Sequence, residues 1–321
     1  MTDILRRLAM ILVAAATTVG TIGPASALDT RFKDADGDML ADIPTDPKDL
    51  IDPATLVFAY TPVEDPAVYA KVWDGFLKHM ETATGRKVQF FPVQSNAAQI
   101  EAMRAGRLHI AAFNTGSNPI AVACAGFRPF AMMASKKDEF GYRMQFITHP
   151  GAGIEKIEDI KGKKLAFTSE TSNSGYKAPS ALLRDQFKME AKKDYEPVFS
   201  GKHDNSILGV ANKDFPAASI ASSVMDRMMA RGVVKREQIK VIYESERFPT
   251  SGYGVVHNLK PELQAKIKEA FFSFKWEGTE LLKEFEKSEP PQEKFVEISF
   301  KDKWKVVRDI DAAMGVNYGC K

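Results

Sequence analysis

The sequence alternates short β-forming runs with segments that have the periodicity of amphipathic helices. In the first half of the chain, strand patterns occur at Leu56–Tyr60, Lys87–Val93 and Leu108–Phe113. Apolar residues recur at every fourth position from Val68 to Met80, which predicts a helix after the first strand. Asn96 is placed to cap a second helix. Strands that alternate with helices in this way indicate an open α/β sheet.

A second series of the same kind begins near Lys163. Its strand patterns are Lys164–Thr168, Glu196–Ser200, Ala217–Ala221 and Ile239–Tyr243, with helix patterns between them. Two such series in a chain of 321 residues predict two α/β lobes, which agrees with the usual size of domains. In open α/β sheets, ligands bind at the carboxyl ends of the strands, so we expect one cleft between the lobes.

Extended segments near Arg143–Thr148 and Phe248–His257 separate the two series, and we predict that the chain crosses between the lobes there. The C-terminal third is mostly of helical pattern and is expected to return to the first lobe. The predicted division is a leader at 1–27, an acidic segment at 28–54, a first lobe made of 55–148 with 257–321, and a second lobe at 149–256.

The N-terminus has the features of a secretory signal peptide. Arg6 and Arg7 precede the apolar run Leu8–Ala16, and Ala25-Ser26-Ala27 supplies small residues for cleavage. The run is shorter than the roughly 20 residues that a membrane span needs. We therefore expect a mature chain that begins near Leu28 and resides in the periplasm. The full chain has 44 basic against 42 acidic residues, and this near balance predicts no general attraction to nucleic acid.

The chain contains two cysteines, Cys124 and Cys320. In an oxidising compartment they predict one disulfide, which would fasten the C-terminus to the body of the protein. Two unpaired cysteines are the alternative, because the sequence does not show whether their Cα atoms approach closely enough for a bond.

A cluster of four aspartates lies in the N-terminal segment: Asp34, Asp36, Asp38 and Asp42. Carboxylates at positions 1, 3, 5 and 9 of a loop can converge on Ca²⁺, which takes six to eight oxygen ligands. The loop lacks the glycine and the bidentate glutamate at the places where an EF-hand carries them. The cluster therefore has two interpretations, a structural calcium site and a solvated acidic arm.

The segment Thr168–Gly175 follows a predicted strand and contains five hydroxyl side chains. Because the first N–H groups of a helix lack partners within the helix and its dipole is positive at that end, such a segment can bind a tetrahedral oxyanion. Serine and threonine also cap helices without binding a ligand. The segment alone therefore leaves both interpretations open.

Several motifs together resemble one family. They are Phe58–Pro62 (FAYTP), Thr171–Gly175 (TSNSG), and Ser200–Ser206 with Val210–Asn212, which match the pattern SGxHxxSxxxVAN. In this order and spacing, over nearly all of the mature chain, they resemble the extracytoplasmic solute-binding proteins of ABC importers for phosphonate, phosphite and phosphate. The resemblance implies the two-lobe, type II periplasmic-binding-protein fold, with a ligand held in the cleft.

The resemblance also implies which residues hold the ligand. Hydroxyl and N–H groups of the second-lobe loop would donate to the phosphoryl oxygens, with a histidine beside them and a tyrosine from the first lobe. Asn114 and Thr115 form the turn after the third strand, which lacks the family's usual Gly-Pro and Tyr pattern. We include them among the ligand-binding residues because of their position at the end of that strand. The implied ligand-binding residues are Tyr60, Asn114, Thr115, Thr171, Ser172, Asn173, Ser174 and His203. A capping pair of His203 with Asp204 is the alternative for the histidine.

Family members that take aminoalkyl phosphonates use acidic residues of two second-lobe loops to hold the ammonium group. Here the matching loops, Ser219–Ser223 and Phe248–Gly252, contain no carboxylate, although Glu244 and Glu246 lie close in sequence. A buried ammonium without a partner costs several kcal/mol, on the order of the penalties measured for buried charges. The expected ligand is therefore phosphite, phosphate or a small uncharged alkylphosphonate.

These features predict a monomeric binding protein that captures a small phosphorus oxyanion and delivers it to the membrane subunits of an ABC importer, with no required cofactor and no catalytic residue. A secreted phosphoester or phosphonate hydrolase is the alternative from another class, but the chain has neither a G-x-S-x-G nor an H-E-x-x-H motif. A binding protein for a sulfonate or another anion is a further alternative, because hydroxyl groups alone do not separate phosphorus from sulfur.

Overall fold

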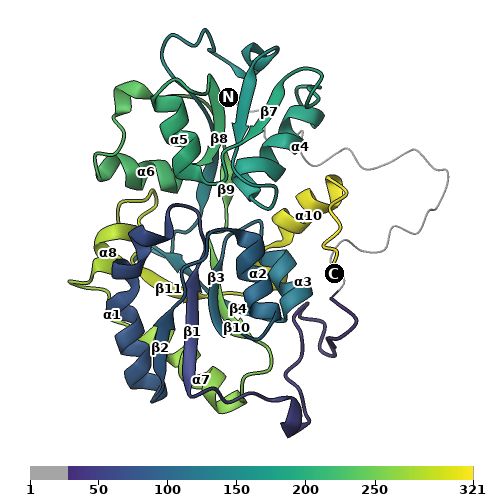
Figure 1. Cartoon of the computed structure of the whole chain (residues 1–321), viewed down its shortest axis with the longest axis vertical. Coiled ribbons are helices and arrows are strands. Elements are labelled where there is room, and N and C mark those ends of the chain that lie inside the picture. The colour runs from purple at the N-terminus through teal and green to yellow at the C-terminus, as the bar shows by residue number, and fades with distance from the viewer. Residues whose placement is uncertain (1–27, 321) are drawn as a thin grey trace, which may run out of the picture.

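The computed structural model describes residues 28–320 and consists of two α/β lobes stacked along the long axis (Figure 1). The first lobe is built on a six-stranded sheet of order β11-β4-β10-β3-β1-β2. Its parallel part is β2-β1-β3, and β10 runs antiparallel to β3 and β4. The strands are β1 (Thr55–Tyr60), β2 (Lys87–Phe90), β3 (Ile110–Phe113), β4 (Phe127–Ala134), β10 (Gly252–Val256) and β11 (Lys294–Glu297).

The second lobe is built on a five-stranded sheet of order β7-β6-β8-β5-β9. In this sheet β6 runs parallel to β7 and β8, and β5 is antiparallel to both β8 and β9. Each lobe has its own hydrophobic core. The strands are β5 (Tyr142–Thr148), β6 (Lys164–Phe167), β7 (Glu196–Phe199), β8 (Ala217–Ala221) and β9 (Lys240–Phe248).

Helices flank both sheets. In the first lobe they are α1 (Pro66–Thr84), α2 (Asn96–Arg104), α3 (Asn118–Ala125), α7 (Pro261–Ser273), α8 (Glu280–Phe285) and α9 (Phe300–Lys303). In the second lobe they are α4 (Ala178–Asp185), α5 (His203–Ala211) and α6 (Ser222–Ala230), preceded by the π-helical turn η3 (Asn173–Lys177). Short 3-10 turns occur at η1 (Pro47–Asp49), η2 (Ile157–Ile160) and η4 (Arg236–Gln238).

Helix α1 shows how local sequence sets these elements. Asp65 caps it by accepting the N–H of Ala67, and Gly85 ends it in the left-handed conformation at φ 68°. The predicted apolar stripe is partly wrong, because Val68 is 37% exposed. Phe76 and Met80 of that stripe are buried, as predicted. In the first half of the helix the bulkier Tyr69 and Trp73 are buried in place of Val68 and Val72, because they remove more apolar area from water.

One of the two crossings between the lobes differs from the predicted one. Tyr142–Thr148 is strand β5 of the second sheet, and Gly252–Val256 is strand β10 of the first sheet. The predicted lobe ranges had placed each segment in the other lobe. The chain crosses first between β4 and β5, which is before the predicted Arg143–Thr148, and again between β9 and β10, which is within the predicted Phe248–His257. The pattern of a strand shows that it is buried but not which sheet it joins, because that depends on pairing with strands far away in sequence.

The C-terminal segment makes a third link. Trp304 belongs to the first core, whereas Ile310 of α10 (Lys305–Ala313) packs against the second, where α10 also contacts α4. Figure 1 shows α10 beside the junction of the lobes. Cys320 then returns to the first lobe, where it forms the predicted disulfide with Cys124 of α3. The C-terminus is thereby fastened across the junction.

The N-terminal acidic segment packs along the first lobe. Asp29 donates its N–H to the carbonyl of Ala123, and Ile51 forms a bridge with Leu259. The predicted signal peptide, 1–27, lies outside the described residues. Among residues 28–320, no helix has both the length and the apolar character required to cross a bilayer.

Candidate functional site

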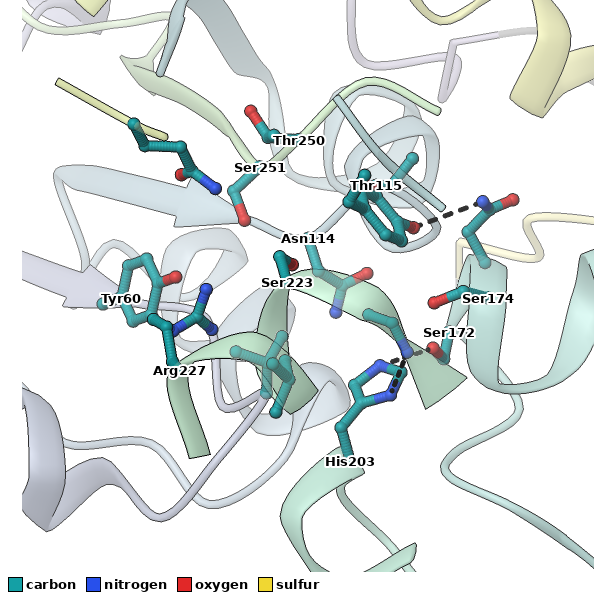
Figure 2. A pocket seen from close by; sticks show the side chains of 16 residues that line it. Tyr60, Asn114, Thr115, Ser172, Ser174, His203, Ser223, Arg227, Thr250 and Ser251 are labelled. Carbon is teal, nitrogen blue, oxygen red and sulfur yellow. Dashed lines mark hydrogen bonds between the residues drawn. The ribbon is translucent and has the colours of Figure 1, made fainter. Parts of the chain in front are cut away.

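A cavity of about 50 Å³ lies between the two lobes (Figure 2). The first lobe contributes the ends of β1 and β3, and the second lobe contributes the loop after β6 and the starts of α5 and α6. These are the carboxyl ends of strands, where the cleft was expected. The lining residues are Tyr60, Val63, Asn114, Thr115, Tyr142, Ser172, Asn173, Ser174, His203, Ala221, Ser223, Val224, Arg227, Thr250, Ser251 and Gln292.

The hydroxyl-rich loop after β6 forms one wall. Ser172 lies just before η3 and accepts the N–H of Gly175 at 3.0 Å, so it caps the turn. Thr168 donates its N–H to the carbonyl of Gly175 at 3.0 Å, which folds the loop back on the strand. A Cβ at Gly175 would lie 1.9 Å from Oγ1 of Thr168, so only glycine fits there. Ser172 and Ser174 are both buried and line the cavity.

His203, at the start of α5, lies beside this wall. Its Nδ1 accepts the backbone N–H of Ala221 at 3.1 Å, so in the neutral ring the proton is on Nε2. Nε2 lies 3.4 Å from Oγ of Ser172. Burial lowers the pKa of His203 to about 4, so the ring is neutral at physiological pH. His203 therefore offers a neutral N–H donor at the cavity.

The alternative of a His203–Asp204 capping pair is wrong. Both ring nitrogens of His203 have other contacts, Nδ1 with the Ala221 N–H and Nε2 with Ser172. The Asp204 carboxylate instead accepts the N–H of Asp65, in the first lobe, at 3.0 Å. Asp204 thus serves as a contact between the lobes.

Two tyrosines enclose the cavity. Tyr60 at the end of β1 is buried, with its ring centroid 4.5 Å from that of Tyr69, and burial raises the pKa of its phenol. Tyr142 at the start of β5 accepts the side-chain N–H of Asn173 at 3.3 Å. Both phenols are therefore protonated at neutral pH and can donate hydrogen bonds.

The turn after β3 positions Asn114 and Thr115. Asn114 accepts the N–H groups of Gly116 and Ser117 through Oδ1, which closes the turn before α3. Its Nδ2 donates to Oδ1 of Asn96 at 2.7 Å. The Thr115 hydroxyl donates to the carbonyl of Pro249 at 2.7 Å. Both residues line the cavity, as predicted, although the hydroxyl proton of Thr115 is already used.

Thr171 is the predicted residue that does not line the cavity. Its Oγ1 accepts the side-chain N–H of Asn96 at 2.9 Å, and Asn96 reaches from the first lobe. Asn96 is not the helix cap that the sequence suggested, because Ser95 takes that role by accepting the N–H of Ala98. Asn96 thus joins the two lobes, and Thr171 is its partner in the second lobe.

The remaining lining residues were not predicted as ligand contacts. Ser223, Thr250 and Ser251 lie in the two loops that had been considered only for a missing carboxylate. Tyr142 had been placed in a crossing segment. Arg227 and Gln292 have no local motif around them, so no sequence signal identifies them.

The cavity is polar but has little net charge. Among the described residues that line it, none is acidic, and Arg227 is the only charged one. Glu244, which lies close in sequence to the loop Phe248–Gly252, does not line the cavity. Its carboxylate accepts a hydrogen bond from the side-chain N–H of Gln145 at 2.6 Å and forms an ion pair with Arg143 at 3.3 Å. Within 28–320, Oγ1 of Thr250 and Oδ1 of Asn173 are buried without a hydrogen-bond partner. They are free to bond a ligand.

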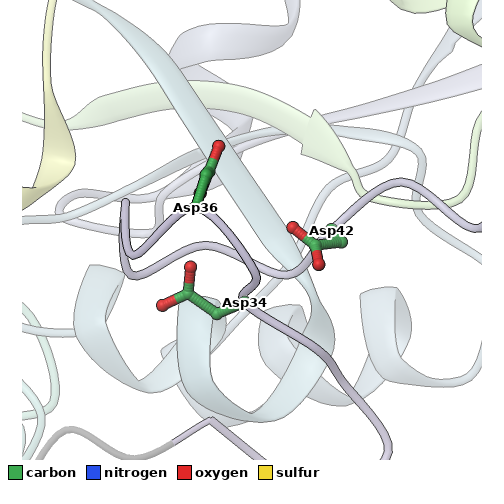
Figure 3. A group of neighbouring side chains, drawn as sticks. All are labelled: Asp34, Asp36 and Asp42. Atoms are coloured by element: carbon green, nitrogen blue, oxygen red, sulfur yellow. The ribbon is translucent and has the colours of Figure 1, made fainter.

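Three of the four N-terminal aspartates lie together (Figure 3). One carboxylate oxygen from each of Asp34, Asp36 and Asp42 lies within 4.8 Å of the others. Asp38 does not join them, because it lies 3.9 Å from Arg128 and accepts a backbone N–H of its own loop. The calcium site stays a prediction, with three carboxylates. It predicts that Ca²⁺ raises the unfolding midpoint of the wild-type protein but not that of Asp34→Asn.

Two α/β lobes around a small polar cavity define the class of two-lobe binding proteins with the type II fold. A solved binding-protein component of an ABC phosphonate transporter from Pseudomonas aeruginosa superposes with a TM-score of 0.73 at 24% identity, over 81% of this chain and 86% of that one. PhnD1 from Prochlorococcus marinus, solved in complex with methylphosphonate, superposes with a TM-score of 0.72 at 18% identity, over 82% and 99%.

The sequence comparisons identify the family. The family model for the periplasmic substrate-binding protein of the phosphonate ABC transporter matches residues 58–303, and the chain belongs to that family. It is 29% identical to the phosphate-import protein PhnD of Mycolicibacterium smegmatis, over 68% of this chain and 71% of that protein. It is 26% identical to the phosphonates-binding periplasmic protein of Escherichia coli, over 63% of this chain and 61% of that protein.

Proposed function

We propose that this protein captures a small phosphorus oxyanion, such as phosphite, phosphate or a short alkylphosphonate, outside the cytoplasmic membrane and delivers it to an ABC importer. One observation carries the proposal. The hydroxyls of Ser172 and Ser174, the neutral Nε2–H of His203 and the phenol of Tyr60 meet at one cavity that has no acidic lining residue within 28–320. Neutral donors of this kind stabilise an oxyanion.

The size of the cavity supports a small ligand. Its volume of about 50 Å³ is far below the roughly 300–1,000 Å³ of pockets that hold drug-sized molecules. The relatives support the same class of ligand, since one is named for phosphate import and one was solved with methylphosphonate. Without a lining carboxylate, an ammonium group would be buried unpaired, so aminoalkyl phosphonates are disfavoured.

The mechanism we propose is closure of the lobes over the ligand. The ligand contacts Tyr60 and Asn114 from one lobe and Ser172 and His203 from the other only when the cleft is shut. Binding therefore favours the closed form over the open one. No bond is made or broken, and opening at the importer's membrane subunits releases the ligand.

The geometry around His203 favours a binding protein over a hydrolase. A serine nucleophile needs a base that accepts its proton, and in such enzymes a carboxylate orients the histidine. Here the backbone N–H of Ala221 donates to Nδ1 of His203, so Nε2 carries the proton and faces Ser172 as a donor. The Ser172–His203 pair is thus arranged to bind an anion and not to activate a nucleophile.

Isothermal titration of the mature protein, stripped of ligand by unfolding and refolding, tests the proposal. The titrants are phosphite, phosphate, methylphosphonate, 2-aminoethylphosphonate and sulfate. We expect tight binding of one or more of the first three and weak binding of the last two. A preference for 2-aminoethylphosphonate or sulfate would overturn the assigned ligand class, and the absence of binding by all five would overturn the function.

We expect Ser172→Ala to weaken binding of the preferred anion by roughly 1–3 kcal/mol, because it removes a charge-assisted hydrogen bond. Ser180→Ala is the matched control. Ser180 lies on α4, away from the cavity, and its hydroxyl has no partner among the described residues. Titration of both variants checks the prediction, and equal affinities of Ser172→Ala and the wild type would contradict it.

We propose in addition that residues 1–27 direct secretion, and that the mature protein works in the periplasm as a monomer that needs no cofactor and binds no nucleic acid. The periplasmic family supports the location. The near-balance of 44 basic and 42 acidic residues supports the absence of nucleic-acid binding.

A further inference from the structure

Arg227 of α6 and Arg231, the residue that caps the C-terminal end of this helix, reach from the second lobe into the first. Arg227 and Arg231 lie one helical turn apart, and both pair with Glu64 and Glu284 of the first lobe. Nη2 of Arg227 donates to Oε1 of Glu64 at 3.0 Å, and Nη1 of Arg231 donates to Oε1 of Glu284 at 2.5 Å. Arg227 also donates to the Ser288 hydroxyl at 3.2 Å. Two cations of one lobe thus neutralise two anions of the other.

Arg227 is the buried member of the arginine pair. Its side chain is 2% exposed, whereas that of Arg231 is 20% exposed. Its Cζ lies 5.3 Å from the centroid of the Phe285 ring, and Nη2 lies 3.3 Å from the Tyr69 hydroxyl. All of these partners belong to the first lobe. The guanidinium is therefore enclosed in a socket formed by Glu64, Tyr69 and Phe285, although its backbone belongs to the second lobe.

Glu64, the charged residue of the socket, is ionised beside two arginines of the other lobe. Glu64 is 1% exposed. Burial alone would raise its pKa, but Arg227 and Arg231 outweigh burial and hold the pKa of Glu64 below its usual range. If the lobes separate, the arginines withdraw and these charges return to water. The pairing therefore belongs to the closed form and not to the fold of either lobe.

Arg227 also lines the ligand cavity. Figure 2 shows its guanidinium beside Tyr60, with Ser223 nearby. The same side chain therefore borders the ligand space and fills the socket between the lobes. A ligand that draws the lobes together seats Arg227, and a seated Arg227 completes one wall around the ligand.

We infer that Arg227 is a positioning residue for ligand capture, which holds the lobes closed by docking its guanidinium in the socket of Glu64, Tyr69 and Phe285. The inference rests on the proposed function, since it assigns the residue that couples binding to closure. Without Arg227, the carboxylates of Glu64 and Glu284 share a single cation, Arg231, so one negative charge at the junction stays uncompensated. A buried charge left in this way is far more costly than loss of an exposed ion pair. Loss of Arg227 therefore penalises the closed form specifically.

The test compares Arg227→Met with Arg236→Met, a control at an exposed arginine of the same lobe. For the anion that the wild-type protein binds, we expect the Kd of Arg227→Met to rise roughly 100-fold or more, mostly through a faster dissociation rate. Small-angle scattering at saturating anion should show less compaction than in the wild type. Arg236→Met should match the wild type in both measurements.

A second variant separates the docking of Arg227 from damage to the fold. Without Arg227, Arg231 alone faces the carboxylates of Glu64 and Glu284. Glu64→Gln combined with Arg227→Met restores one anion to one cation, so it should bind at least tenfold more tightly than Arg227→Met alone, as coupled neighbours do. Wild-type affinity and compaction in Arg227→Met, or no recovery in the double variant, would overturn the inference while leaving the proposed function intact.

Failure of the proposed function gives a different result. If the wild-type protein binds none of the five titrated anions, the ligand-free radius of gyration decides the role of Arg227. If docking of Arg227 holds the lobes closed, the radius of gyration of Arg227→Met should be larger than those of the wild type and Arg236→Met. Equal radii in the three proteins would overturn the inference.

Discussion

Replacing Gly116 by alanine should block closure of the lobes and leave each lobe folded. Gly116 follows β3 in the first lobe, and its Cα faces the backbone of the hydroxyl-rich loop of the second lobe. An added Cβ would lie 2.2 Å from the carbonyl oxygen of Thr171 and 2.5 Å from the backbone nitrogen of Asn173. Both atoms are backbone atoms of the ligand-binding wall, so they cannot rotate away as the end of a side chain can.

The expected loss of affinity is about 3 kcal/mol, a factor of roughly 100, which is the upper range for overpacking of a well-packed contact. The clash exists only in the closed form, because the colliding atoms belong to different lobes. The unfolding midpoint of the ligand-free protein should therefore change little. Titration of the preferred anion and thermal unfolding without ligand measure the two quantities separately.

Gly75→Ala is the matched control. Gly75 lies inside α1 of the same lobe, and a Cβ there would meet no atom within 4 Å. Alanine is the better helix former by roughly 0.5–1 kcal/mol, so this variant should be slightly more stable and bind normally. Unchanged affinity of Gly116→Ala would show that the bound form does not need this close approach of the two backbones.

The sequence predicted those parts of the site that depend on one short segment. The loop of Ser172 and Ser174 follows a buried strand and precedes a helix, and both features are visible in local sequence. His203 was identified through the pattern around it. Cys124 and Cys320 could be paired because no other cysteine competes. For these residues, position along the chain determines position in space.

The parts that were missed depend on the meeting of the two lobes. Nothing near Arg227 in sequence indicates that its charge faces Glu64, and nothing near Asn96 indicates its bond with Thr171. In the sequence, Gly116 is part of the turn Asn114–Ser117 and has no feature that distinguishes it from other turn glycines. Each contact joins segments far apart in the chain, and its geometry follows from how two separately folded cores pack together, which local patterns do not encode.

His203→Asn and His203→Ala should both weaken anion binding, but only the alanine variant should also lower the stability of the fold. Asparagine can place its carbonyl oxygen where Nδ1 accepts the N–H of Ala221, and it has no donor at the position of Nε2. Each variant should lose roughly 1–3 kcal/mol of binding, the value of a hydrogen bond to a charged group. Alanine in addition leaves the Ala221 N–H unpaired and buried, which costs about 1–3 kcal/mol of stability.

The same variants test the ionisation of the histidine. His203 has a pKa of about 4 in the folded protein, against about 6.5 in an unfolded chain. Between these values the unfolded state binds more protons, so stability rises with pH over this window and the contribution is complete above about 6.5. Acidification from pH 6.5 to 4 should therefore destabilise the wild type by about 3 kcal/mol more than His203→Asn, at 1.4 kcal/mol per unit.

His257, whose pKa burial and two nearby arginines lower to about 4, makes a similar contribution and remains in both proteins, so the difference between them isolates His203. Urea unfolding at several pH values between 4 and 7 measures this difference. Parallel stability curves for the wild type and His203→Asn would mean that His203 titrates normally in the folded state. A normally titrating ring would be cationic in mild acid and would attract the anion by its charge. A neutral ring, whose orientation is fixed by the Ala221 N–H, instead donates one directed hydrogen bond from Nε2. In that case the affinity for a fixed charge form of the anion should be independent of pH near 6.5.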